Sequence, residues 1–300
     1  MKNFWLGKSL LLFLLVFIIA SCSGQQIIGG GGGVKMDFMD KEEKPPKEIL
    51  SGQDFNVGLK LEYEGKNPVN GVICLIDTIP ENDIYGYSNP PSEGGDCTGF
   101  NLLGSQLVYE RGRVIKTKPV EQTILFPEGG TYIYERIQKE TDATFTVDIL
   151  LNYDSEVRGI VDIDPNQKGK NSIKNLRGHR DSAITLSKGS YLIDYIEGLG
   201  MATIRLELEF SNTGDGEIHS GKNPESFAVG VELVDYGSFI CTNNNIVVLD
   251  KNKGDLKCKI EVPIESAEQR FSKEVIIQYS YEYKQTKSFS VKLKSSGYYT

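Results

Sequence analysis

The sequence contains little histidine: in 300 residues, His179 and His219 are the only imidazoles. Both stand in polar turn sequences, RGHRDS and GEIHSG. A Ser–His–Asp triad needs a histidine held beside a serine and a carboxylate, and no G-x-S-x-G nucleophile elbow accompanies either one. We interpret both histidines as solvated loop residues. The sequence predicts no catalytic residue, and we expect a protein that is not an enzyme.

Basic clusters and paired cysteine motifs are also lacking. The chain has 33 Lys+Arg against 41 Asp+Glu, a net charge of −8, and no basic cluster is interleaved with aromatic residues. Nucleic-acid binding therefore has no electrostatic footprint. No CxxC motif occurs, and with so few histidines a zinc site is disfavoured. The sequence predicts no cofactor, no metal and no nucleic-acid partner.

One alternative to the absence of a metal stays open. Asp162, Asp164 and Asn166 follow one another at i, i+2 and i+4, a spacing that occurs in calcium loops. However, Pro165 interrupts the pattern, and the twelfth position is Ile173 where such a loop has glutamate. A solvated turn is the favoured interpretation, with calcium binding as the alternative.

The apolar run near the start of the chain is short. Eleven uninterrupted apolar residues, 10–20, follow Lys2 and Lys8, and residues 1–21 contain no acid. At 1.5 Å per residue, such a helix reaches about 16 Å, against roughly 30 Å for a hydrocarbon core. A positive start, a short apolar run and a small-residue exit are typical of an export signal. We predict a signal peptide over residues 1–21.

The end of this signal, Ile-Ala-Ser-Cys at positions 19–22, resembles the lipobox of prokaryotic lipoproteins. The resemblance implies that Cys22 is the lipidated first residue of the mature chain, anchored to the outer face of the cell membrane. An ordinary secretory signal is the alternative. Residues 22–33 end in five glycines, and we interpret them as a flexible tether between the lipid and the folded part.

Four cysteines remain once Cys22 is set aside: Cys74, Cys97, Cys241 and Cys258. An even number in an exported chain indicates disulfides, and four cysteines allow three connectivities. Pairing neighbours, the first with the second and the third with the fourth, is the simplest of these. Each bond would close a loop of about 20 residues, worth roughly 3 kcal/mol in chain entropy.

Strict alternation of apolar and polar residues recurs along the chain, and no segment after the signal shows a sustained helical period. A period of two is typical of a half-buried antiparallel strand, so the fold class is predicted to be all-β. The alternating segments are FNVGLKLEY (55–63), TFTVDILLNY (144–153), ATIRLELEFS (202–211), SFAVGVEL (226–233) and EVIIQYSYEYK (274–284).

The alternation runs separately in two halves of the chain. We expect two tandem antiparallel, immunoglobulin-like β-sandwich domains, at residues 34–165 and 183–300. Residues 166–182 are mostly polar and are predicted to be a linker. Contacts between the halves are then expected to be modest, and residues 183–300 are expected to fold alone.

Two aromatic features are candidates for binding. Tyr279, Tyr281 and Tyr283 could form a partner-binding face with Tyr298 and Tyr299, although a core position with hydroxyls at the rim is favoured. The turn-rich segment from residue 77 to 104 is the other candidate, because long loops on rigid scaffolds often carry recognition. Its aromatic and aliphatic residues outside any alternating strand are Ile84, Tyr85, Tyr87 and Phe100, and packing within the fold is the alternative role for them.

The layout resembles the two-domain surface lipoproteins of small-genome archaea, which have immunoglobulin-like or CARDB-like sandwiches. The segments that carry the resemblance are the glycine-rich tether, GVKMDFMDKEEKPPKEILSGQDFNVGLKLEYEG, TFTVDILLNYDSEVRGIVDI, RLELEFSNTGDGEI, ICTNNNIVVLDKNKGDLKCKIEVPI and VIIQYSYEY. The resemblance implies a tethered cell-surface protein and carries over no reaction.

We therefore expect a non-enzymatic, lipid-anchored surface protein that serves adhesion, envelope structure or the binding of a protein or glycan partner. The alternative is an exported ligand-capture lipoprotein or a hydrolase with a site between the two domains. Solute capture normally uses two α/β lobes around a cleft, and the helical pattern for such lobes is missing.

Overall fold

The structure is a computed structural model, and its described part is built from β-strands, turns and one short 3-10 segment, Thr242–Asn245. This confirms the all-β prediction. The described residues belong to one compact unit, Gly31–Thr300. The predicted signal, Cys22 and all of the tether except Gly33 lie outside them. The structure describes residues 33–295 except 40–43, 66, 78–84, 88–95, 105, 111–112, 138, 168, 179–181, 197, 220–224 and 267.

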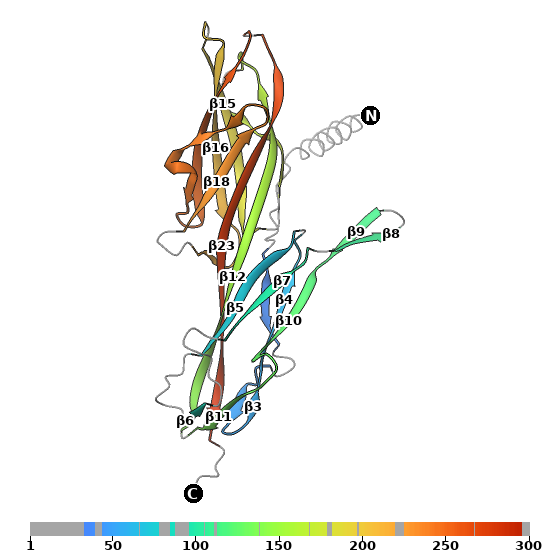
Figure 1. The fold of residues 1–300 in the computed structure, drawn as a ribbon, viewed down its shortest axis with the longest axis vertical. Helices are drawn as coiled ribbons and strands as arrows, with labels where there is room; N and C mark the ends of the chain where they lie inside the picture. Colours follow the sequence, from blue (N-terminus) through green and yellow to red (C-terminus); the bar gives the residue numbers. More distant parts are fainter. Residues whose placement is uncertain are drawn as a thin grey trace, which may run out of the picture. The chain divides into compact units, whose positions relative to one another are not determined.

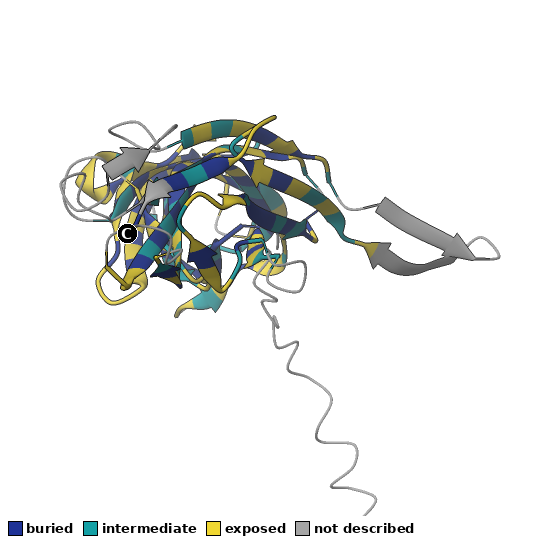
Figure 2. Cartoon of the chain, turned by 90° about the horizontal axis from the view of Figure 1, so that it is seen from below, coloured by how far each residue is buried: buried dark blue, intermediate teal, exposed yellow. Residues whose placement is uncertain are grey.

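Two long strands run side by side through the fold (Figure 1). β12 spans Thr141–Ile163 and β23 spans Phe271–Lys294, and they pair antiparallel without a register shift. Along β12, every second residue from Ala143 onward is buried, as the alternation predicts. Figure 2 shows the same alternation of buried and exposed residues along the strands. We call this pair of strands the β12–β23 ribbon.

A first group of strands surrounds one half of the ribbon, residues 141–152 and 283–294. β5 pairs with β12 and β7 with β5, while β2 lies parallel to the end of β23. The facing sheet has the order β1-β4-β10. The bounds are β1 Lys35–Phe38, β2 Glu48–Leu50, β3 Asp54–Phe55, β4 Val57–Tyr63, β5 Val69–Asp77, β6 Tyr85–Tyr87, β7 Asp96–Leu102, β8 Gln106–Glu110, β9 Arg113–Lys118, β10 Val120–Phe126 and β11 Tyr132–Arg136.

A second group surrounds the other half of the ribbon. β14 extends the sheet beside β12, and β18 extends it beside β23. The facing sheet has the order β13-β15-β16-β22-β20. The bounds are β13 Asn171–Ser172, β14 Lys174–Gly178, β15 Ile184–Ile196, β16 Met201–Asn212, β17 Glu217–Ile218, β18 Ser226–Leu233, β19 Gly237–Ser238, β20 Ile240–Cys241, β21 Ile246–Val248 and β22 Lys253–Pro263.

Aromatic side chains pack the facing sheets together in both groups. In the first group, the rings of Phe38 on β1 and Phe289 on β23 lie 4.4 Å apart between centroids. In the second, Phe210 on β16 lies 5.4 Å from Tyr279 on β23 and 5.3 Å from Phe227 on β18. Each group is therefore a β-sandwich whose inner faces meet in an apolar core.

The expectation of modest contacts between the two halves of the chain is wrong. β12 belongs to the first predicted domain and β23 to the second, yet their pairing runs from Thr141 opposite Leu293 to Ile163 opposite Phe271. The chain between about residues 153 and 282 forms the second group, and the end of β23 then returns to the first. The second sandwich is thus an insertion between two adjacent strands of the first sandwich.

The predicted polar linker, residues 166–182, also contains strands. β13 pairs with β15, and β14 pairs with β12. Ile173 between them is buried, and it packs over Gly159 of β12, where an added Cβ would lie 2.4 Å from the Ile173 Cγ2 atom. Leu176 also lies over Gly159, with its Cδ2 atom 2.9 Å from the added Cβ, so the two apolar residues of the segment join the core, which its low apolar content did not predict.

Candidate functional site

The segment predicted for recognition, residues 77–104, contains two strands. Phe100 lies in β7 and is buried, with 6% of its surface exposed. Its ring covers Gly71 on β5, where an added Cβ would lie 2.9 Å from the Phe100 Cζ atom. Phe100 is therefore a packing residue of the core, which was the alternative to recognition for this segment. Tyr85 and Tyr87 form β6, which pairs with β11, and Ile84 lies outside the described residues.

The structure confirms both predicted disulfides. One bond joins Cys74 of β5 to Cys97 of β7, and the other joins Cys241 of β20 to Cys258 of β22. Cys97 lies on the solvent side of its sheet, whereas Cys241 and Cys258 are buried. Two disulfides in one chain indicate an extracellular or otherwise oxidising compartment.

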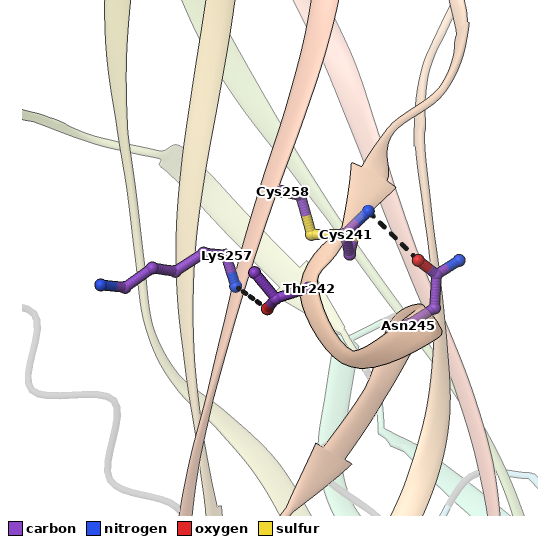
Figure 3. The surroundings of a disulfide bond; sticks show 5 residues. All are labelled: Cys241, Thr242, Asn245, Lys257 and Cys258. Carbon is purple, nitrogen blue, oxygen red and sulfur yellow. Dashed lines mark hydrogen bonds between the residues drawn. A yellow bond between two sulfur atoms is a disulfide. The ribbon is translucent and has the colours of Figure 1, made fainter.

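The turn after Cys241 is held by its own side chains (Figure 3). The backbone N–H of Cys241 donates to Asn245 Oδ1 at 3.2 Å, and the N–H of Lys257 donates to Thr242 Oγ1 at 3.4 Å. Three successive asparagines, 243–245, have positive φ, a region that asparagine enters more readily than most residues. We interpret the turn as a structural closure beside the disulfide.

The two histidines and the calcium-spaced residues show no assembled site among the residues that the structure describes, although the N–H of Asn166 donates to Asp164 Oδ1 at 3.0 Å. His219 is exposed at the end of β17, and His179 lies outside the described residues. Asp162 binds Lys174 and Ser272, whose hydrogen bonds lower the pKa of its carboxyl group, and Asp164 pairs with Arg270. No group of three His, Cys, Asp or Glu side chains that could hold a metal ion occurs in the part of the chain that the structure describes. The two carboxylates therefore serve contacts between strands and turns.

The three tyrosines of β23 are core residues, as favoured from the sequence. Tyr279, Tyr281 and Tyr283 are all buried, and burial raises the pKa of each hydroxyl. Their hydroxyls hold the backbone of neighbouring turns: that of Tyr281 accepts from the N–H of Ile184 at 2.8 Å, and that of Tyr283 accepts from the N–H of Gly216 at 2.6 Å. These tyrosine hydroxyls therefore stabilise the fold. Tyr298 and Tyr299 lie outside the described residues.

A groove of about 810 Å³ runs between β1 and the last part of β23. Phe38 packs edge-on against Phe289, which stacks in turn on Phe145 of β12 at 5.1 Å between centroids. The groove therefore has an aromatic floor. We call it the β1–β23 groove, and its lining includes Phe38, Pro45, Lys47, Lys60, Lys287 and Phe289.

Cations line the rim of the β1–β23 groove. Lys287 Nζ donates to the carbonyl of Met36 at 2.7 Å and contacts the carboxylate of Asp37. Lys60 pairs with Glu121 at 3.0 Å, and this hydrogen bond raises the pKa of Lys60 and keeps it charged. Both lysines are thus already paired with carboxylates, and Lys47 is the lining lysine with no ion pair among the described contacts, so the groove offers a ligand mainly its apolar floor.

A second hollow, of about 720 Å³, lies on the outer face of the ribbon. Its polar side chains already bind one another: Asn152 Nδ2 donates to Asn70 Oδ1 at 3.2 Å, and Gln278 Nε2 donates to Glu156 Oε2 at 2.9 Å. Polar groups are already paired in both hollows, and the β1–β23 groove is the better candidate site because its floor is aromatic.

The groove residues were not predicted from the sequence. Phe38, Phe289 and the three lysines lie far apart along the chain, and only the pairing of β23 with the first group brings them together. One signal was present: the stretch KQTKSFSVKLK, residues 284–294, has four lysines and no acid in a chain that is acidic as a whole.

No protein-family model matches the chain, and no curated protein matches it. Among solved structures, the chain is similar to the native conformation of E. coli alpha-2-macroglobulin, with 10% sequence identity and a TM-score of 0.15. This likeness covers 89% of the present chain and 17% of that chain. At such a TM-score it carries no argument about fold or function. No helix in the described part of the chain is long and apolar enough to cross a membrane.

Proposed function

We propose that this protein is a lipid-anchored, non-enzymatic protein of the cell surface that displays immunoglobulin-like β-sandwiches for adhesion or partner binding. The observation that carries the proposal is the combination of two disulfides with an export-type leader ending at Cys22. Disulfides persist in oxidising compartments, and the lipobox-like exit supplies a reason for the chain to stay at the membrane after export. Residues 22–33 then act as the tether.

The residues that line the β1–β23 groove support a function in partner binding over one in catalysis. An aromatic floor recognises the shape of an apolar group. The sandwiches supply a rigid frame for it, since the groove is built from strands of both facing sheets. A surface protein of this kind presents its groove to a protein or glycan partner at a distance set by the tether.

Anchoring is tested with the Cys22→Ala variant expressed in a prokaryotic host that processes lipoproteins. We expect the variant to leave the membrane fraction or to remain as unprocessed precursor, because the lipid acceptor is gone. Ser21→Ala is the matched control, because it keeps a small residue before the cysteine and should stay anchored. If Cys22→Ala is cleaved at the same place and still sediments with membranes, the proposed anchoring is wrong.

A further inference from the structure

The start of β1 and the start of β10 lie at the same end of one sheet. Both strands pair antiparallel with β4, one on each side, and they begin opposite its last two residues, Glu62 and Tyr63. Neighbouring strands lie about 4.8 Å apart, so the two starts are separated by roughly 10 Å. The tether ends at Gly33, shortly before β1. The tether and the segment that leads into β10 therefore meet at one end of the first sandwich.

The segment that leads into β10 is a hairpin of β8 and β9, which we call the β8–β9 arm. Only Pro119 separates β9 from β10. β8 and β9 pair with each other and with no other strand that the structure describes, and the arm projects from the first group (Figure 1). The six residues of β9 span about 20 Å. Because a two-stranded hairpin alone is marginally stable in water, a further surface would stabilise the arm.

The composition of the arm differs from that of the whole chain. Five of the eleven residues of β8 and β9 are apolar, and three are basic against one acid. The two residues between these strands include no acid, whereas the chain as a whole has a net charge of −8. Apolar and cationic residues together favour contact with anionic lipid headgroups. The apolar residues are Leu107, Val108, Tyr109, Val114 and Ile115, and the charged ones are Glu110, Arg113, Lys116 and Lys118.

Described side chains at the base of the arm have the same character. Leu103, which precedes β8, is 64% exposed. Lys118, the last residue of β9, is exposed and makes no ion pair with a side chain that the structure describes. In the sheet nearby, Lys35 lies 3.8 Å from Glu64, so its charge is already compensated. The excess positive charge at this end of the sandwich therefore belongs to the arm.

We propose that the β8–β9 arm lies on the membrane to which Cys22 is anchored and binds its anionic headgroups, giving the protein a second membrane contact beside the lipid. This inference rests on the proposed anchoring. The eleven residues 23–33 reach roughly 18 Å as a flexible chain, so the anchor keeps the membrane within reach of an arm of similar length. A second contact also fixes how the sandwiches are oriented on the surface.

A second copy of the chain is a poorer occupant than the membrane. Another copy is acidic as a whole, so it too attracts the arm, but it must be recruited from solution. The tether supplies the membrane surface continuously, and a contact made on a tether is in effect intramolecular. Self-association also has a distinct signature, because it depends on protein concentration and needs no vesicles.

The test uses residues 22–300, which contain nearly all of the compact unit and every described strand. With both disulfides formed, Cys22 is the only free thiol, so it couples the chain to vesicles that carry a maleimide-headgroup lipid. Trp5 precedes this fragment, so Tyr109→Trp introduces its only tryptophan. On vesicles of phosphatidylglycerol and brominated phosphatidylcholine, we expect quenching of this tryptophan. Tyr236→Trp, in the second sandwich, is the matched control and should stay unquenched.

Charge reversal separates headgroup binding from chance proximity. In the Tyr109→Trp background, Lys116→Glu with Lys118→Glu should reduce the quenching at least about fivefold, because one lysine near an anionic surface contributes roughly that factor. Lys257→Glu with Lys259→Glu makes the same change at two exposed positions of β22 and should leave the quenching unchanged. Should the arm variant fail to fold, vesicles of brominated phosphatidylcholine alone decide, since the quenching should fall by a similar factor on them.

Three results would overturn the proposal. One is equal quenching at the two tryptophan positions, and another is quenching that survives both the charge reversal in the arm and the removal of anionic lipid. The third is a change in tryptophan emission that rises with protein concentration without vesicles, which would assign the arm to a second copy. Because maleimide coupling replaces the natural lipid, failure here leaves the membrane release expected of Cys22→Ala unaffected.

Discussion

Tyr153 on β12 and Tyr281 on β23 lie directly opposite each other, with their rings stacked at 5.4 Å between centroids. The pair lies at the boundary between the two sandwiches along the β12–β23 ribbon. The hydroxyl of Tyr153 accepts from the N–H of Val34, at the start of the first group, at 3.4 Å. The hydroxyl of Tyr281 accepts from the N–H of Ile184, in the second group, at 2.8 Å. One stacked pair therefore contacts the backbone of both sandwiches.

Tyr281→Phe should destabilise the protein by about 1–3 kcal/mol, because the buried N–H of Ile184 loses its acceptor. Tyr153→Phe should cost less, since its bond to Val34 is longer. The free energy of unfolding in urea measures both. Tyr236→Phe is the control, because the described contacts of Tyr236 are made by its ring face. An equal loss in the control would assign the effect to something other than the hydroxyl bond.

Alkaline pH should unfold the protein through these tyrosines. Burial raises the pKa of Tyr153, Tyr279, Tyr281 and Tyr283 above the ordinary value near 10. The unfolded chain therefore releases these protons first, so the stability they contribute is full below about pH 10 and falls as the pH rises beyond it. Urea midpoints from pH 8 to 11.5, read with tyrosinate absorbance, test this. A double variant, Tyr153→Phe with Tyr281→Phe, should show a shallower decline, and an unchanged slope would contradict the assignment.

The pairing of β12 with β23 determines which fragment of the chain should fold alone. Residues 183–300, expected from the sequence to fold alone, lack β12, β13 and β14 and carry an end of β23 that pairs in the first group. Residues 151–284 contain both ribbon strands of the second group. We expect the fragment 151–284 to unfold cooperatively, and 183–300 to be less stable or disordered by circular dichroism. Equal urea midpoints for the two fragments would show that the pairing with β12 is dispensable.

The two disulfides should differ in how readily they are reduced. Cys97 is exposed, whereas Cys241 and Cys258 are buried, so a thiol in solution should open Cys74–Cys97 first. Alkylation and peptide mapping during mild dithiothreitol treatment follow the order. Replacing Cys241 and Cys258 by alanine should cost about 3 kcal/mol, the chain entropy of a loop of 17 residues. Reduction of the buried bond first would contradict the exposure argument.

The sequence by itself determined the properties that depend on near neighbours. Alternation placed Phe145, Leu206 and Tyr281 on buried faces, because successive side chains of a strand point to opposite sides. The sequence favoured the two observed disulfides as the simplest of three connectivities, and each pair lies on adjacent strands. The strand that contains Phe100 was not predicted, because glycine and polar neighbours hide it from a pattern of period two.

Only the tertiary structure decided which strands are partners. The alternation in β12 indicates which of its faces is apolar. Several other strands of the chain alternate in the same way, so the pattern alone does not identify the partner of β12. Pairing with β23 was selected by the whole set of facing side chains along both strands, from Phe145 beside Phe289 to Tyr153 beside Tyr281. The groove beside Phe289 exists because of that pairing, since burial is a local property of a strand whereas its partner is set by the packing of the entire fold.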